Sequence, residues 1–139
     1  INSHRSSGYC KDLIIKYSDR FPIWVFLELI SFGDLVKFYE FYGEVYPKRL
    51  KDKELLHNVR ALRNASAHSN CLINNLKKGS EKPSQKIIQF VTQRTNIGKG
   101  QRKTKLSNTF INDFVTLIYV YEKFVLSKET KRKRIKEVK

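Results

Sequence analysis

The sequence predicts an all-α protein. In several segments apolar residues recur every three or four positions, which is the period of an amphipathic helix. No neighbouring segments alternate apolar and polar residues in the way that paired, half-buried strands do. The 139 residues are 40% hydrophobic and 12% aromatic, which suffices for one helical domain with a buried core. We expect this domain to span residues 1–127, with a basic insertion at 77–105 and a basic tail at 128–139.

The first half of the chain contains helical segments separated by polar or glycine-containing turns. Residues 13–17 predict a short helix. In the segment 22–30 a proline can begin a helix, and the apolar-rich run that follows is compatible with either a buried helix or a core strand. We expect Trp24 in this run to be in the core. Apolar residues at helical spacing over 35–42 predict a helix that ends before a glycine, and residues 51–69 predict the next helix.

The second half of the chain begins with the basic insertion, which is rich in lysine and arginine around one apolar island at 87–91. We expect one helix there. Ser107 is a suitable N-cap for a long helix that follows, and this helix has two apolar faces, so we expect it to be central. Residues 128–139 carry seven Lys or Arg residues and predict a frayed basic tail.

The charge balance predicts a polyanionic partner. The chain has 28 Lys and Arg against 13 Asp and Glu, a formal net charge of +15. Such an excess is typical of proteins that bind nucleic acid or an acidic membrane face. The longest apolar run is too short to span a bilayer, and no signal peptide is visible, so we expect a cytoplasmic protein without a membrane partner. Cys10 and Cys71 lack any zinc-binding spacing, and we expect no metal site, disulfide or cofactor.

The predicted helix 51–69 has two contrasting faces. A projection at 100° per residue places on one side the residues that we expect in the core, namely Leu55, Val59, Leu62 and Ser66. The opposite stripe consists of His57, Arg60, Asn64 and His68. A solvated face is the simplest interpretation of a polar stripe. However, in a chain that is 29% charged we expect such a face to carry Lys and Glu rather than imidazole, guanidinium and amide groups.

Arg63 and His68 together suggest a second interpretation. An arginine binds a phosphate and a histidine transfers protons near neutral pH, so the pair can cleave RNA without a metal ion. On a regular helix the two side chains project about 140° apart. Three arrangements remain open: the long arginine bends into the cleft of the histidine, the helix is distorted near Asn64, or the residues cooperate across a dimer axis.

The sequence around this pair resembles a known family. Residues 63–68 have the sequence R-N-A-S-A-H, which is similar to the R-N-x-x-A-H core of bacterial abortive-infection proteins of the AbiD/AbiF kind, members of the HEPN superfamily. Residues 22–24 resemble the family's P-x-W motif, and residues 28–35 resemble its E-x-x-S-F-G-x-L motif. The resemblance covers roughly residues 9–76. It departs at 69–75, where the family's histidine is followed by a run ending in W-N-R and this chain keeps only asparagine.

The resemblance implies a HEPN-like helical bundle and a metal-independent endoribonuclease of an abortive-infection system, with its site between two protomers. It assigns the proton transfers to His68 and stabilisation of the phosphorane to Arg63. Asn64 then orients either the histidine or the phosphate. One histidine does not easily supply both proton transfers, which is a physical reason to expect a two-fold homodimer. His57 is a less favoured candidate for the second proton transfer, because most exposed histidines have no catalytic role.

The basic segments provide candidate contacts to the RNA backbone. The predicted RNA-binding residues are Arg60, Arg94, Lys99, Arg102, Lys103, Lys105, Lys131, Arg132, Lys133 and Arg134. The main alternative function is a non-catalytic module of the same fold that holds RNA, such as a cognate non-coding RNA. A DNA-binding protein is less favoured because the sequence shows no helix-turn-helix pattern.

Overall fold

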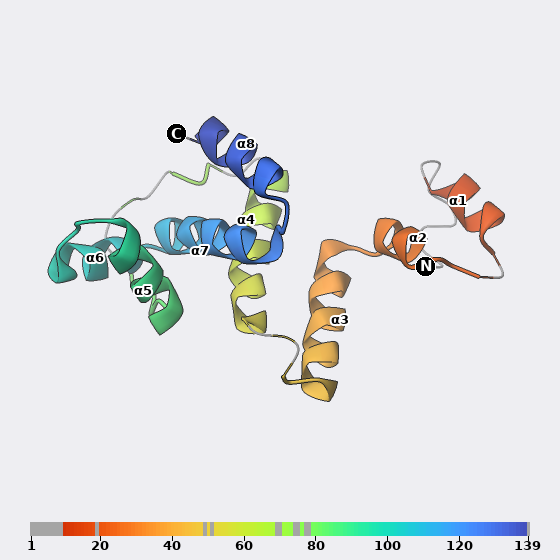
Figure 1. The fold of residues 1–139 in the computed structure, drawn as a ribbon, viewed down its shortest axis with the longest axis horizontal. Coiled ribbons are helices and arrows are strands. Elements are labelled where there is room, and N and C mark those ends of the chain that lie inside the picture. The colour runs from red at the N-terminus through yellow and green to blue at the C-terminus, as the bar shows by residue number, and fades with distance from the viewer. Residues whose placement is uncertain are drawn as a thin grey trace. The chain divides into compact units, whose positions relative to one another are not determined.

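In the computed structural model, all regular structure in the described residues is helical, which confirms the predicted all-α class (Figure 1). The described residues are 10–18, 20–48, 50, 52–68, 71–73, 76 and 79–138, with only the backbone described over 134–138. The chain divides into two compact units, Ile1–Lys53 and Glu54–Lys139. The predicted extent of the helical domain, residues 1–127, stays a prediction.

The first unit contains the helices α1 (Lys11–Lys16), α2 (Ile23–Leu29) and α3 (Phe32–Val45). The apolar run after Pro22 is therefore a helix and not a strand, and Pro22 is its N-cap. Val25 and Leu29, one turn apart, form a core with residues of α1. The prediction that Trp24 is buried is wrong, since it is 49% exposed. Trp24 lies beside the Val25–Leu29 face, where its ring packs edge-to-face on another aromatic ring, that of Tyr17.

Helix α3 begins and ends differently from the prediction. The Ser31 side chain caps its start, because its Oγ accepts a hydrogen bond of 3.1 Å from the backbone N–H of Asp34. The helix continues through Gly43 instead of ending before it. A Cβ atom on Gly43 would lie 3.1 Å from Cδ of Lys53 and 3.6 Å from Cβ of Leu50. The glycine thus allows the segment that follows α3 to approach the helix closely.

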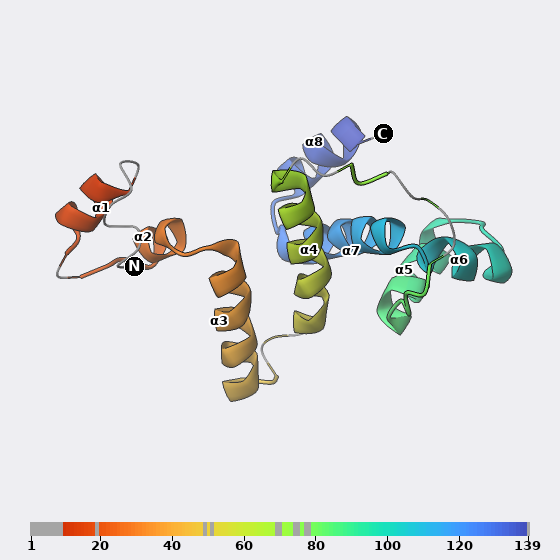
Figure 2. The same cartoon turned by 180° about the vertical axis from the view of Figure 1, so that it is seen from behind.

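The second unit is built around α7 (Thr109–Phe124), which contacts α4 (Leu56–Ala67), α5 (Gln85–Arg94) and α6 (Lys99–Leu106) (Figure 1, Figure 2). The predicted central helix is confirmed. A short 3-10 helix, η2 (Lys53–Leu55), leads into α4.

The start of α7 lies one residue later than predicted. Its N-cap is Asn108, whose Oδ1 accepts a 3.1 Å hydrogen bond from the N–H of Ile111. Ser107 instead ends α6, and its hydroxyl donates to the carbonyl oxygen of Thr104. Both residue types cap helices well, so the sequence alone did not distinguish them.

The basic insertion contains two helices, α5 and α6, where we predicted one. The apolar island forms the buried face of α5, with Ile87, Phe90 and Val91 in the core. Helix α6 is strongly basic but is anchored by the buried side chain of Leu106. Both helices contact α7, so this segment is an integral part of the second unit.

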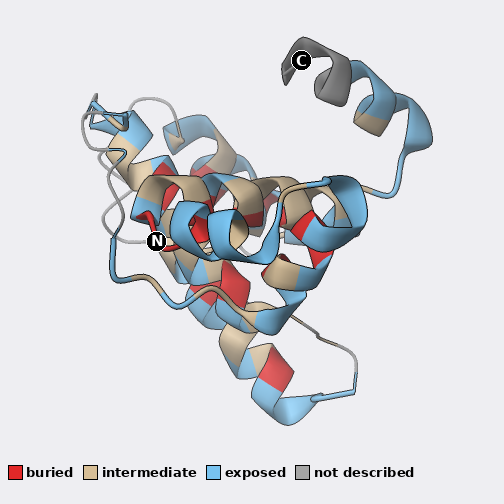
Figure 3. Ribbon diagram, turned by 90° about the vertical axis from the view of Figure 1, so that its left-hand side faces the viewer, coloured by how far each residue is buried: buried red, intermediate tan, exposed pale blue. Residues whose placement is uncertain are grey.

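The predicted frayed tail is also wrong, because residues 128–138 form the helix α8 (Lys128–Val138). Ser127 caps this helix by accepting a 3.2 Å hydrogen bond from the N–H of Thr130. The hydroxyl of Tyr121 on α7 donates to the carbonyl oxygen of Thr130. The described side chains of α8 are mostly exposed (Figure 3).

Candidate active site on helix α4

The buried face of α4 follows the predicted periodicity for two turns. Leu55, Val59 and Leu62 are buried, as predicted. The prediction for Ser66 is wrong, because this residue is exposed and its hydroxyl donates a 2.9 Å hydrogen bond to the carbonyl oxygen of Leu62. A serine can satisfy its hydroxyl on the preceding turn of its own helix, so it needs no partner from the core. The last turn of α4 is therefore exposed on more sides than the sequence indicated.

The predicted catalytic residues lie at this exposed end. Arg63 is exposed, and its Nη1 donates a 3.2 Å hydrogen bond to Oδ1 of the half-buried Asn64. The helix ends at Ala67, and His68 is its exposed C-cap with φ −89° and ψ 13°. The backbone N–H of His68 still donates to the carbonyl oxygen of Asn64, at 3.0 Å. The end of one helix thus presents a guanidinium, an amide and an imidazole.

The structure excludes one of the three arrangements considered for Arg63 and His68. Helix α4 is a continuous α-helix from Leu56 to Ala67, so the predicted option of a distortion near Asn64 is wrong. Within the described part of the chain, no hydrogen bond or ion pair joins the side chains of Arg63 and His68. The remaining options are an arginine that bends into the cleft of the histidine and cooperation of the two residues across a dimer axis.

The other polar residues of the predicted stripe do not all reach this end. His57 is exposed in the first turn of α4, and Arg60 is half-buried in the next. His57 and His68 are eleven residues apart, which corresponds to about 16 Å along a helix. They cannot act on one phosphate within one protomer.

A partly buried polar contact joins α4 to α7. Nδ2 of Asn58 donates a 2.6 Å hydrogen bond to Oδ1 of Asp113, whose residue is 6% exposed. Burial raises the pKa of the Asp113 carboxyl, and the negative charge of Glu81 raises it further. Hydrogen bonds from Asn58 and Asn112 oppose this shift but do not outweigh it.

This contact belongs to a buried face of α7 that was not predicted from the sequence. The buried residues of α7 are Asn112, Asp113, Thr116 and Val120, and three of these four are polar. Their spacing follows the helical period, but polar residues on a helix normally indicate a solvated face. Oδ1 of Asn112 and Oγ1 of Thr116 are buried without a hydrogen-bond partner among the described residues.

The predicted RNA-binding cations of the insertion lie on α5 and α6. Arg94 makes an ion pair with Glu122 on α7. Arg102 donates to the hydroxyl of Thr92 on α5. Three of the predicted cations line one pocket of about 440 Å³, namely Lys99, Arg102 and Lys103. Lys105 is exposed on the same helix.

The remaining predicted cations lie on α8. Arg132 and Lys133 are exposed there and Lys131 is half-buried. The side chain of Arg134 lies outside the described residues, as do Ser69 and Asn70, which directly follow the motif.

Among the described residues, no group of three or more His, Cys, Asp or Glu side chains is placed so that it could hold a metal ion. None of the described helices has the length and apolar character needed to cross a membrane.

Comparison with known proteins identifies the family. Residues 1–74, just over half of the chain, match the family model described as Abi-like protein. The chain belongs to the Abi-like family. The match includes α1 to α4 and therefore the residues Arg63, Asn64 and His68. Helices α5 to α8 of this Abi-like protein lie outside the match, and neither the curated proteins nor the solved structures provide a match to any part of it.

Proposed function

We propose that this Abi-like protein is a metal-independent endoribonuclease of an abortive-infection system, of the HEPN type, and that it acts as a homodimer. The observation that carries the proposal is the exposed end of α4, where Arg63, Asn64 and His68 occur together inside the family match. Chemistry on a large substrate requires such exposure, because the scissile phosphate must reach the catalytic groups.

The reaction uses the ribose 2′-OH as nucleophile. A neutral imidazole takes the 2′-OH proton, and the 2′-oxygen attacks the adjacent phosphorus. The bond from phosphorus to the 5′-oxygen then breaks, and an imidazolium protonates the departing oxygen. The products are a 2′,3′-cyclic phosphate end and a 5′-hydroxyl end. The guanidinium of Arg63 binds the phosphorane oxygens, where negative charge accumulates in the transition state.

Two protomers supply the two proton transfers. His68 of one protomer acts as the base and the same residue of its partner acts as the acid, since His57 lies too far along the helix to serve. The exposed side chains of Ala61 and Ala67 support this arrangement, because small residues allow the α4 helices of two copies to approach each other closely. The net charge of +15 supports a polyanionic substrate.

The test is a cleavage assay on total RNA in the presence of EDTA. Wild-type protein is compared with the Arg63→Ala/His68→Ala double variant, and the new RNA ends are mapped. We expect cleavage in EDTA, 2′,3′-cyclic phosphate ends, no cleavage at a site carrying deoxyribose, and no cleavage by the double variant. Strict dependence on magnesium or manganese, or cleavage of DNA, would overturn the mechanism.

The homodimer has its own test. An Ala67→Glu variant places a bulky charge on the exposed face next to His68, and we expect it to lower dimer content and cleavage together. Light scattering measures the mass of the particle in solution. A wild-type protein that is monomeric while it cleaves RNA would disprove the two-protomer site.

A further inference from the structure

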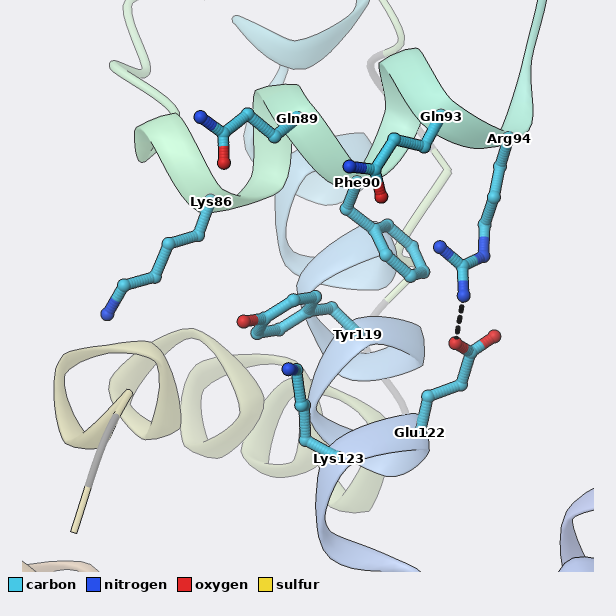
Figure 4. Close-up of a pocket in the computed structure, with 8 residues that line it drawn as sticks. All are labelled: Lys86, Gln89, Phe90, Gln93, Arg94, Tyr119, Glu122 and Lys123. Atoms are coloured by element: carbon cyan, nitrogen blue, oxygen red, sulfur yellow. Dashed lines mark hydrogen bonds and ion pairs between the residues drawn. The ribbon is translucent and has the colours of Figure 1, made fainter.

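A pocket of about 460 Å³ lies between α5 and α7, outside the segment that matches the Abi-like family (Figure 4). Its lining combines aromatic, amide and cationic side chains: Lys86, Gln89, Phe90, Gln93, Arg94, Tyr119, Glu122 and Lys123. Of these, only Arg94 was predicted from the sequence to bind RNA. The spacing of Lys86, Gln89 and Gln93 in the sequence already places these three polar side chains on one face of a helix. It gives no information about which residues of α7 lie opposite them.

The aromatic part of the pocket is held rigidly. The rings of Phe90 and Tyr119 pack edge-to-face with centroids 5.3 Å apart and an interplanar angle of 86°. Phe90 is buried, and Cζ of Arg94 lies 4.1 Å from the centroid of its ring. Arg94 is itself fixed by its ion pair with Glu122. Tyr119 is only half-buried, so its supported ring is a surface on which another flat group can stack.

Charge and hydrogen-bonding capacity surround this ring. Figure 4 shows the phenol of Tyr119 directed toward Lys86. Nζ of Lys123 lies over one face of the Tyr119 ring, 5.7 Å from its centroid. The lining carries three cations and one carboxylate, a net charge of +2, although Lys86 also pairs with Glu54 at 2.8 Å. Gln89 and Gln93, both exposed, add amides that can donate and accept hydrogen bonds.

We propose that this pocket binds one nucleotide of single-stranded RNA, an assignment that rests on the proposed ribonuclease function. The base stacks on Tyr119, its edge forms hydrogen bonds with Gln93, and its phosphate lies near Lys123. Single-stranded RNA is recognised by aromatic stacking combined with polar contacts to the base edges, whereas a duplex keeps its bases stacked and inaccessible. An acidic peptide would use the cations but not an aromatic ring flanked by amides.

The experiment measures binding of a short, unstructured, fluorescein-labelled RNA by anisotropy across a salt series. Removing base stacking in Tyr119→Leu should weaken binding about fivefold or more. Lys123→Gln should weaken binding and lower the slope of log K against log salt by about 0.7, the value for one lost phosphate contact. The matched control is Lys37→Gln, because Lys37 is also an exposed helical lysine but lies in the first unit. We expect it to bind RNA like the wild type.

A second measurement does not depend on the folding of Tyr119→Leu. An RNA containing 4-thiouridine is crosslinked to the wild-type protein, and we expect the crosslinks within residues 86–94 or 119–123. Adenosine monophosphate tests for a mononucleotide site. If it binds as tightly as the RNA and loses affinity equally in Tyr119→Leu, the assignment to an RNA strand is overturned.

The outcomes separate the two proposals. If wild-type protein binds and cleaves RNA but the pocket variants bind normally and crosslinks map elsewhere, the pocket assignment is disproved and the ribonuclease proposal stands. If the pocket binds RNA and no cleavage occurs, the ribonuclease proposal fails and the pocket assignment stands. If wild-type protein does not bind RNA, both are wrong.

Discussion

Helix α4 places two polar residues, Asn58 and Arg63, in opposite environments only five positions apart. Asn58 faces α7 and donates a hydrogen bond to the buried carboxylate of Asp113. Arg63 is exposed near the C-terminal end of the helix, next to Asn64. Five residues correspond to a rotation of about 140° around the helix axis, so the half-buried Asn58 faces α7 while Arg63 faces away from it and is exposed. Whether a polar residue on this helix is structural or available for chemistry is decided by the partner helix and not by residue type.

This division predicts that stability and activity can be changed separately. The buried face holds α4 against α7, and the exposed end carries the residues proposed for catalysis. Substitutions on the buried face should lower the free energy of unfolding and leave cleavage nearly unchanged. Substitutions at the exposed end should lower cleavage and leave the free energy of unfolding nearly unchanged.

The largest expected effect is on catalysis, from His68→Ala. Removing the residue that transfers both protons should lower cleavage about 10²–10⁴-fold. The free energy of unfolding should change by less than about 0.5 kcal/mol, because the side chain is exposed. Single-turnover cleavage and urea unfolding measure the two quantities.

His57→Ala is the matched control, since His57 is exposed on the same helix but lies at its other end. We expect it to cleave RNA like the wild type. RNA affinity should persist in both variants because a neutral imidazole contributes little to binding a polyanion. If His68→Ala instead loses RNA affinity and no wild-type cleavage is found, the non-catalytic RNA-binding module is the better description.

The next largest effect is on stability, from Asn58→Ala. A hydrogen bond to a charged group typically contributes about 1.5–3 kcal/mol, and its loss leaves the Asp113 carboxylate buried with fewer donors. We expect a decrease of that size in the free energy of unfolding, measured in urea. Cleavage per folded molecule should remain near the wild-type value. Unchanged stability would show that water or another group replaces the amide.

The dependence of stability on pH tests the same contact. Because the folded state raises the pKa of Asp113, it binds a proton more readily than the unfolded state does. The contribution of Asp113 is therefore fully present below about pH 4, the usual range for an aspartate, and is lost as pH rises through the raised pKa.

Asp113→Asn provides the comparison, since it retains an acceptor for Asn58 but cannot titrate. We expect the stability of the wild type relative to this variant to fall as pH rises from 4 toward neutrality. Parallel stability curves for the two proteins would show that the folded state does not raise the pKa of Asp113.

The sequence predicted the apolar residues on the buried face of α4 but not the polar contact of that face with α7. Val59 and Leu62 were found from helical periodicity, and the motif from Arg63 to His68 was found from the resemblance to the family. The contact of Asn58 with Asp113 joins positions 55 residues apart. Such a contact leaves no local signal, and polar residues in helices are usually solvated.

The ends of the helices were predicted less well than their buried apolar residues. Ser107 and Asn108 are adjacent and both suitable caps, but it is Oδ1 of Asn108 that accepts the hydrogen bond from the N–H of Ile111. The basic composition of residues 128–139 predicted a frayed tail, but Ser127 caps the helix and Tyr121 donates a hydrogen bond to its first turn. The tertiary contact was not visible in the sequence.

The smallest expected effect concerns Asn64, which has the same side chain as Asn58 but lies at the exposed end of α4. Among the described residues, its side chain makes one hydrogen bond, in which Oδ1 accepts from Nη1 of Arg63 at 3.2 Å. Asn64→Ala should therefore change the free energy of unfolding by less than about 0.5 kcal/mol. Asn64→Asp should lower cleavage further than Asn64→Ala does, because a carboxylate beside Arg63 competes with the phosphate for the guanidinium. Urea unfolding and single-turnover cleavage of both variants check this. A loss of stability as large as that of Asn58→Ala would mean that Asn64 supports the fold, and the contrast between the two faces of α4 would not hold.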